Sequence, residues 1–337
     1  TKSAVLALIL LFPGEPVLVW IGLYMVFYGI VYALLENDAR RILAYSVVNQ
    51  VGFMVCAVGI GTELALNGAA AHAFAHIIYK ALLFMSAGVV IYRTGMTRCS
   101  DLGGLFRTMP LTTVCGIVGA LAISSFPLTS GFTTKTLISV AAEQQGLALV
   151  YFLLAAASAG VFLHAGIKFP WFVFFQKASG LRPKDAPWNM AAAMVLFALG
   201  CIGIGIFPEQ FWTLLPYPVE YDAYAADKVL FYLQLLLFSG LAFFLLLPLM
   251  RRTLTISLDS DWLWRVLLRR IGESLLALLA AAGHRLHAGL NAIVDRAGPR
   301  LLRQLSSVGA LGRTWQIGTT ALWIAVLLTA YMLIYYL

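Results

Sequence analysis

Apolar residues in this chain are grouped into long runs, and short polar segments separate one run from the next. Eight such runs can be outlined, most of them close to 20 residues long. A helix of about 20 apolar residues crosses the hydrocarbon core of a bilayer. The pattern therefore predicts an all-α, polytopic membrane protein with spans at 16–35, 42–60, 68–92, 111–145, 147–172, 189–207, 229–250 and 315–337.

The polar segments alternate in charge. Every second segment is rich in lysine or arginine: 36–41, 93–110, 173–188 and the residues after 250. The segments between them, such as 61–67 and 208–228, carry mainly acidic side chains. Because positively charged loops stay on the cytoplasmic side, we expect the basic loops to be cytoplasmic and the protein to lie in a bacterial inner membrane. The net charge of +8 then needs no nucleic-acid partner.

One apolar run is too long for a single crossing. Residues 111–145 contain the sequence Ser-Ser-Phe-Pro-Leu-Thr-Ser-Gly at 124–131, with Lys135 shortly after it. Proline, glycine and hydroxyl residues at membrane depth favour an interrupted helix, and such interruptions often line ion pathways. The sequence predicts a broken helix here, with Lys135 in the first turn of its second half.

The chain changes character after residue 250. Residues 251–314 hold ten arginines and four acidic residues, between apolar stretches too short to span a bilayer. We expect amphipathic helices there, cytoplasmic or lying along the membrane surface, with His284 and His287 on a solvated face. The predicted organisation is a transmembrane bundle over 1–250, this basic segment, and a last transmembrane helix at 315–337.

Composition supports the membrane setting. The chain is 61% hydrophobic and 11% charged, whereas soluble domains are about 25% charged. Its four cysteines are scattered without a Cys-x-x-Cys pair, which suggests neither a disulfide framework nor a metal cluster. The first residues, Thr1 to Ser3, lead directly into an apolar stretch that resembles the end of a helix. We therefore expect part of the protein to be missing before it.

Three ionisable residues stand out within the run 68–92. His72, His76 and Lys80 recur at every fourth position, so a helix places them on one face. Lys80 falls near the bilayer centre, too deep to snorkel to the surface. A lysine at that depth is costly and persists mainly where it faces a protein interior or a water-filled path.

Each candidate residue has more than one interpretation. A metal or haem at His72 and His76 would need further ligands, which no neighbouring span supplies. Hydrogen bonds between helices are a second explanation, and a proton relay is favoured because histidine titrates near neutral pH. Lys135 either caps the broken helix or carries protons, since the positive end of the half-helix favours its neutral form. For Lys168, near the end of its span, snorkelling is the better explanation.

Taken together, three stretches resemble the antiporter-like subunits of respiratory complex I and of Mrp-type multisubunit cation/proton antiporters. They are Asp38–Ser46, the pattern from His72 to Lys80 continued by Ala-Leu-Leu-Phe, and Phe126–Lys135. Further stretches look most like the D subunit of the Mrp type: Gly166–Phe175, Ser179–Lys184 and Arg252–Leu258.

The resemblance implies two inverted five-helix repeats, each with one broken helix. Residues 16–172 would form the second repeat, and the first repeat, with its buried glutamate–lysine pair, would be absent from this chain. It also implies a central relay of His72, His76 and Lys80 and an outer Lys135, at a position where the family has lysine or glutamate.

The function so implied is proton translocation as a subunit of a multisubunit monovalent cation (Na⁺)/H⁺ antiporter. Partners would be the other subunits of that hetero-oligomeric complex, protons, monovalent cations and the lipid bilayer; no cofactor is expected. A transporter subunit is not itself an enzyme. Two alternatives stay open. One is a proton-pumping subunit of complex I or of a membrane-bound hydrogenase. The other is a structural membrane subunit that conducts nothing.

Overall fold

The computed structural model describes residues 2–248, 263–306, 309, 312 and 317–336. It divides into two compact units, Thr1–Ser257 and Leu258–Leu337. The prediction of an all-α protein is confirmed, and seven described helices are long and apolar enough to cross a membrane. The chain is therefore a multi-pass membrane protein. The stretch Arg252–Leu258, used above for the resemblance, lies outside the described residues.

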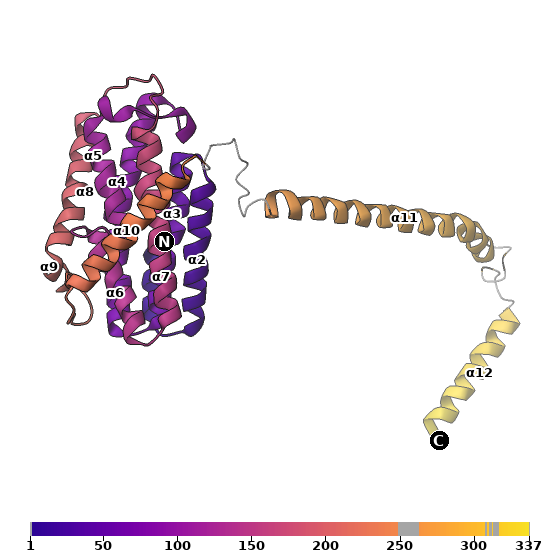
Figure 1. Ribbon diagram of the computed structural model, residues 1–337. Coiled ribbons are helices and arrows are strands. Elements are labelled where there is room, and N and C mark those ends of the chain that lie inside the picture. The colour runs from indigo at the N-terminus through magenta and orange to yellow at the C-terminus, as the bar shows by residue number, and fades with distance from the viewer. Residues whose placement is uncertain (1, 249–262, 307–308, 310–311, 313–316, 337) are drawn as a thin grey trace. The chain divides into compact units, whose positions relative to one another are not determined.

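The first unit is a bundle of helices packed side by side (Figure 1). Its first half consists of α1 (Lys2–Leu11), α2 (Pro16–Leu35), α3 (Ala39–Ile60), α4 (Glu63–Thr94), the 3₁₀ turns η1 (Cys99–Asp101) and η2 (Leu105–Arg107), and α5 (Pro110–Ile123). Its second half consists of α6 (Ser130–Gln144), α7 (Ala148–Val161), η3 (Phe162–Lys168), η4 (Trp171–Phe175), α8 (Trp188–Ile206), α9 (Pro208–Trp212) and α10 (Ala226–Leu246).

The second unit contains η5 (Leu263–Leu268), α11 (Arg269–Leu305) and α12 (Ile317–Tyr336). None of the described residues in these helices is buried. His284 and His287 are exposed on α11, where a solvated face was expected. The placement of this segment at a membrane surface stays a prediction.

Capping residues fix the ends of α3 and α4 beyond their apolar runs. The Asp38 side chain accepts hydrogen bonds from the backbone N–H groups of Arg40 and Arg41, which starts α3 three residues before the predicted span. The Thr62 hydroxyl caps α4 in the same way, and Gly95 ends it in a left-handed conformation. As a result α4 has 32 residues, and its candidate side chains lie well inside it.

Glycines bring α2 and α3 into close contact. A Cβ at Gly22 or Gly29 of α2 would meet the backbone of α3, and a Cβ at Gly52 or Gly59 of α3 would meet the backbone of α2. Small residues of this kind let two helix backbones approach within a membrane. The contact holds α3 in a fixed position beside α2.

The long run 111–145 is interrupted as predicted. Helix α5 ends at Ile123 and α6 begins at Ser130, and between them Ser125 and Leu128 adopt positive φ angles of 59° and 66°. Gly131 lies directly after the break, where a Cβ would collide with the carbonyl group of Ala122. The two half-helices can therefore pass each other only with glycine at position 131.

We expect Gly131→Ala to destabilise the protein by about 2 kcal/mol, because the added methyl group has no space and must displace backbone. Gly203→Ala is the matched control, since nothing lies within 4 Å of a Cβ added there. Thermal unfolding of the detergent-purified protein measures both. Equal midpoints for the two variants would contradict the crossing described here.

Candidate functional site

A set of buried polar side chains runs through the interior of the first unit. All are at most 4% exposed, and they come from α3, α4, α6 and the π-helix η3: Asn49, Gln50, His72, His76, Lys80, Thr134, Lys135, His164 and Lys168. The four candidate residues from the sequence are all among them. Polar groups buried at membrane depth are expensive unless they are paired or functional.

His72 lies at the centre of a hydrogen-bonded cluster. Its Nδ1 atom is 2.9 Å from the Thr134 hydroxyl, and its Nε2 atom is 3.1 Å from Oε1 of Gln50. The Tyr79 hydroxyl donates to the same Gln50 oxygen over 3.0 Å and also lies 3.2 Å from His72 Nε2. Asn49 extends the cluster by donating to the carbonyl of Val26 on α2. Sequence reasoning missed Gln50, Tyr79 and Thr134 as partners, although Asn49 and Gln50 are adjacent polar residues inside an apolar run.

These partners satisfy His72 in both of its protonation states. When the ring is protonated, Nε2–H donates to Gln50 Oε1 beside the Tyr79 hydroxyl, and Nδ1–H donates to the Thr134 hydroxyl, which itself donates to the carbonyl of Ser130 over 2.9 Å. When the ring has lost its Nδ1 proton, the Thr134 hydroxyl can turn and donate to Nδ1, while Nε2–H still donates to Gln50. The cluster can therefore gain or lose a proton without leaving a buried group unpaired.

His76 and Lys80 are in a different situation. Neither the ring nitrogens of His76 nor the Lys80 Nζ atom have a hydrogen-bond partner among the residues that the structure describes. The His76 ring packs against the rings of Tyr79 and His72, at centroid distances of 5.3 Å and 6.4 Å. The Lys80 ammonium lies 5.9 Å from the centre of the Phe84 ring.

Lys135 occupies a different place from the one expected. It is the sixth residue of α6, beyond the first turn, and its side chain reaches back to donate to the carbonyl of Ile123 over 2.6 Å. It also lies over the Phe53 ring, 4.9 Å from the centroid. The ammonium therefore faces the negative, carbonyl end of α5. The expectation that it feels the positive end of its own half-helix was wrong, because the break brings the end of α5 within its reach.

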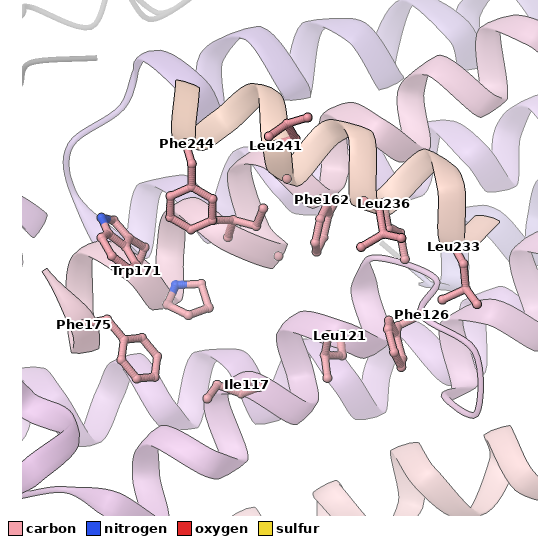
Figure 2. A pocket seen from close by; sticks show the side chains of 15 residues that line it. Ile117, Leu121, Phe126, Phe162, Trp171, Phe175, Leu233, Leu236, Leu241 and Phe244 are labelled. Atoms are coloured by element: carbon pink, nitrogen blue, oxygen red, sulfur yellow. The ribbon is translucent and has the colours of Figure 1, made fainter. Parts of the chain in front are cut away.

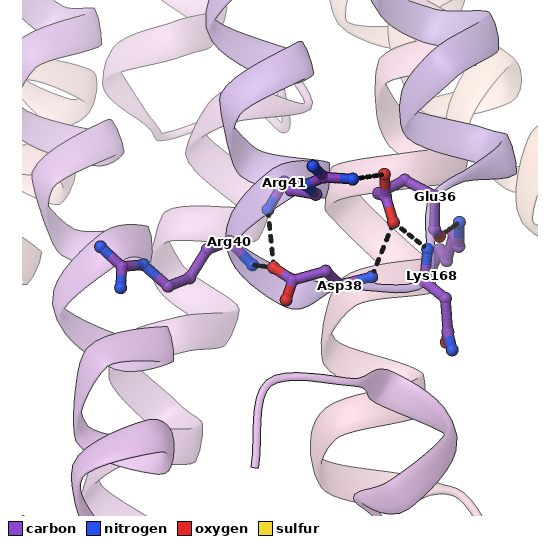
Figure 3. A network of polar contacts seen from close by, with 6 residues as sticks. Glu36, Asp38, Arg40, Arg41 and Lys168 are labelled. Carbon is purple, nitrogen blue, oxygen red and sulfur yellow. Dashed lines mark hydrogen bonds and ion pairs between the residues drawn. The ribbon is translucent and has the colours of Figure 1, made fainter. Parts of the chain in front are cut away.

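Lys168 does not snorkel. It is 4% exposed, and its Nζ donates to the carbonyls of Ala33, Leu34 and Glu36 over 2.6–2.9 Å. Figure 3 shows Lys168 beside Glu36. The last carbonyls of a helix have no partner within it, and Lys168 supplies one for the end of α2. The Glu36 carboxylate accepts from the backbone N–H groups of Asn37 and Asp38 and lies 3.6 Å from Arg41.

His164 is a buried histidine that sequence reasoning did not single out. It precedes Lys168 by four residues in η3, and its side chain is fully buried. Its Nδ1–H donates to the Gly160 carbonyl over 2.8 Å, while Nε2 has no hydrogen-bond partner among the described residues. The signal for it was present, since a lone histidine four residues before a lysine inside an apolar run is unusual.

The described residues contain no group of three or more histidine, cysteine, aspartate or glutamate side chains that could hold a metal ion. Both ring nitrogens of His72 already contact Thr134 and Gln50. What the site contains instead is a row of buried side chains with titratable groups: Lys80, His76 and His72 on α4 and Lys135 on α6.

Comparison with known proteins gives one family and several relatives. Residues 4–163 match the family described as NADH:quinone oxidoreductase/Mrp antiporter, TM. The chain is 30% identical over 223 residues to the A/B subunit of a probable K(+)/H(+) antiporter of Rhizobium meliloti (strain 1021), a match that covers 62% of this chain and 22% of the relative. It is 39% identical over 126 residues to the D subunit of the Na(+)/H(+) antiporter of Alkalihalophilus pseudofirmus, a match that covers 37% and 25%. The chain thus spans about a quarter of the length of these relatives.

Two solved structures are similar in fold. A chain of the membrane-bound sulfane sulfur reductase, an archaeal respiratory membrane complex, aligns with a TM-score of 0.58 and 25% identity over 94% of this chain and 55% of that one. A chain of the Mrp complex from Dietzia sp. DQ12-45-1b aligns with a TM-score of 0.54 and 20% identity, over 65% and 49%.

We expect Lys168→Met to lower the stability of the bundle by at least about 2 kcal/mol, because hydrogen bonds from a charged donor are lost and three carbonyls, two of them in buried hydrogen bonds, stay behind. Lys177→Met, at an exposed position close by in the chain, is the control. Unfolding midpoints in detergent report the difference. A Lys168→Met protein as stable as the control would mean that the side chain does not hold the end of α2.

Proposed function

We propose a function for this chain from one premise, that residues 4–163 belong to the NADH:quinone oxidoreductase/Mrp antiporter membrane family. The chain is an antiporter-like membrane subunit. Its proposed role is to move protons within a multisubunit monovalent cation (Na⁺)/H⁺ antiporter. The observation that carries the proposal is the buried series Lys80, His76, His72 and Lys135, in which neighbouring groups differ in how firmly they are hydrogen-bonded.

His72 supports proton transfer more strongly than a purely structural role. A histidine that only ties two helices together needs partners for one protonation state. His72 has partners for both, because the Thr134 hydroxyl can donate either to the Ser130 carbonyl or to His72 Nδ1. A group that is equally well accommodated with and without its proton can pass that proton on at little cost.

His76 and Lys80 support the same role because they lack the hydrogen bonds that His72 has. Buried polar groups in folded proteins are normally paired, and here neighbouring members of the series lack hydrogen-bond partners among the described residues. Such a group is tolerated where it faces a hydrated pathway inside the protein. A subunit that served only as a scaffold would gain stability by replacing both side chains with apolar ones.

The alternative within the same family is a proton-pumping subunit of complex I or of a membrane-bound hydrogenase. The family description covers both oxidoreductase and antiporter complexes, and the same buried residues would serve either. Relatives of both kinds match the chain, antiporter subunits as well as subunits of NADH–quinone and NADH–ubiquinone oxidoreductases. We propose the antiporter because the stretches Gly166–Phe175 and Ser179–Lys184 resemble the D subunit of the Mrp type. Genes for small cation-antiporter subunits beside this one, rather than for iron–sulfur subunits, would support this choice.

We propose that the chain works in a hetero-oligomeric complex in a bacterial inner membrane, with its basic loops on the cytoplasmic side. Residues 16–172 would form one inverted repeat, and residues 251–314 would lie along the cytoplasmic surface before a last span at 315–337. Structural neighbours from multisubunit membrane complexes support the hetero-oligomeric assembly.

Lys80→Met in the complete complex should abolish cation-driven proton flux, because the side chain keeps its length but can no longer hold a proton. The measurement is dissipation of a pH gradient by added Na⁺ or K⁺ in everted membrane vesicles, with assembly of the complex checked by native electrophoresis. Lys177→Met serves as the exposed control. Normal flux through the Lys80→Met complex would remove Lys80 from the pathway.

A pair of substitutions at Lys135 separates proton transfer from capping. Arginine can still donate to the Ile123 carbonyl but does not release its proton, whereas methionine does neither. We expect Lys135→Arg to assemble with near-normal stability and yet to lose most of the flux in the same assay. If Lys135→Arg transported at the wild-type rate, Lys135 would act only as the cap of α5.

A further inference from the structure

His164 is the buried titratable group that the proposed pathway leaves unused. It lies in η3, a stretch of π-helix that continues α7 from Phe162 to Lys168. Stretches of π-helix are rare and occur frequently at functional sites, because the wider turn changes which side chains face inward. The tighter turns of an α-helix would place this histidine differently with respect to its neighbours.

The two sides of this π-helix have different surroundings. Phe162, Gly166 and Ile167 face α10 and α5, where they line an apolar cavity of about 590 Å³ (Figure 2). His164 and Lys168 do not line that cavity, and both are buried in the protein. The apolar cavity therefore does not account for the missing hydrogen bond at His164 Nε2, because His164 does not line it.

His164 and Lys80 lie at similar depth. The helices that carry them, α4 and α7, both begin after connections on the side of the acidic loops. Lys80 follows Glu63, the first residue of α4, by 17 positions, and His164 follows Ala148, the first residue of α7, by 16. Each position adds about 1.5 Å of rise along a helix. Both side chains are thus near the middle of the bundle.

The buried charged side chains in the part of the chain that the structure describes are Lys80, Lys135 and Lys168, together with Glu36 at the end of α2. Of the other elements packed against η3, α5 contains no charged residue, α10 has charges only in its first turn, and α2 ends next to Glu36. Arg40 and Arg41 of α3 are exposed at the start of that helix, and Arg41 lies beside Glu36.

The hydrogen bonding of His164 leaves it ready to accept a proton. Its Nδ1–H is held by the Gly160 carbonyl, so in the neutral ring Nε2 carries the free lone pair. Close by, a Cβ added at Gly166 would touch the Ser124 hydroxyl, so η3 lies directly against the break between α5 and α6. The Ser125 hydroxyl in that break is also buried without a hydrogen bond to any described residue.

We propose that His164 is a further proton-carrying side chain, which exchanges protons with Lys80 through water inside the bundle and leads towards the end of the bundle where Lys168 and Glu36 lie. In this step the N–H bond of the Lys80 ammonium breaks and an Nε2–H bond forms on His164, across bridging water. Lys80 becomes a neutral amine and the imidazole becomes a cation. This inference rests on the proposed proton transport, and it gives the pathway a branch towards the basic loops.

Two substitutions distinguish this role from packing. His164→Asn keeps an N–H group near Nδ1, so it can still donate to Gly160, but it cannot titrate. His164→Gln places its amide near the position of Nε2 and also cannot titrate. His284→Gln, at an exposed position on α11, is the control. All are tested in the complete complex in everted vesicles, after cation-driven flux has been established for the wild type.

We expect both His164 variants to assemble normally and to slow proton flux by about a hundredfold, as is typical when a group that transfers protons is removed. Their residual flux should also depend on pH differently from that of the wild type and of His284→Gln. A His164→Asn complex with wild-type flux and pH profile would overturn the inference, and so would a failure of both variants to assemble. If the wild type itself showed no cation-driven flux, the proposed function would fail instead.

Discussion

The constraint on which this structure depends is that backbone carbonyls inside a bilayer must find donors within the protein. The bundle interrupts its helices, and each interruption exposes carbonyls. Lys135 donates to the end of α5 at Ile123, and Lys168 donates to three carbonyls at the end of α2. Two buried lysines therefore hold the backbone in place. Their positive charges face the negative, carbonyl ends of helices.

A proton pathway through such a protein has to combine firm and loose hydrogen bonding. His72 contacts Gln50 of α3, Tyr79 of its own helix α4 and Thr134 of α6, and these contacts fix the position of its ring. His76 and Lys80 are buried without such partners among the described residues. The firm cluster keeps the geometry constant and accommodates His72 with and without its proton, and the groups without partners are those that a hydrated path can reach. Neither arrangement alone would give a defined path for protons.

Much of this could be predicted from the sequence, because apolar runs and loop charges determine which segments enter a membrane. The interruption after Ile123 followed from Pro127 and Gly131, and the shared face of His72, His76 and Lys80 followed from their spacing. The partners of these residues could not be predicted, because they depend on which helices meet. The direction of Lys135 and the role of Lys168 were misjudged for that reason, since each reaches a carbonyl far away in the sequence.

The glycine contacts between α2 and α3 also determine where the bundle can move. At Gly22, Gly29, Gly52 and Gly59 each backbone fits against the other without space for a methyl group, so sliding one helix along the other would drive side chains into backbone. This pair acts as a stationary frame, and Gln50 keeps a constant depth as part of it. Any rearrangement that opens one side of the pathway and closes the other must then come from the interrupted elements, α5 with α6 and the π-helix after α7. The glycine-packed pair α2 and α3 would then stay rigid, and the breaks in the other helices would act as hinges.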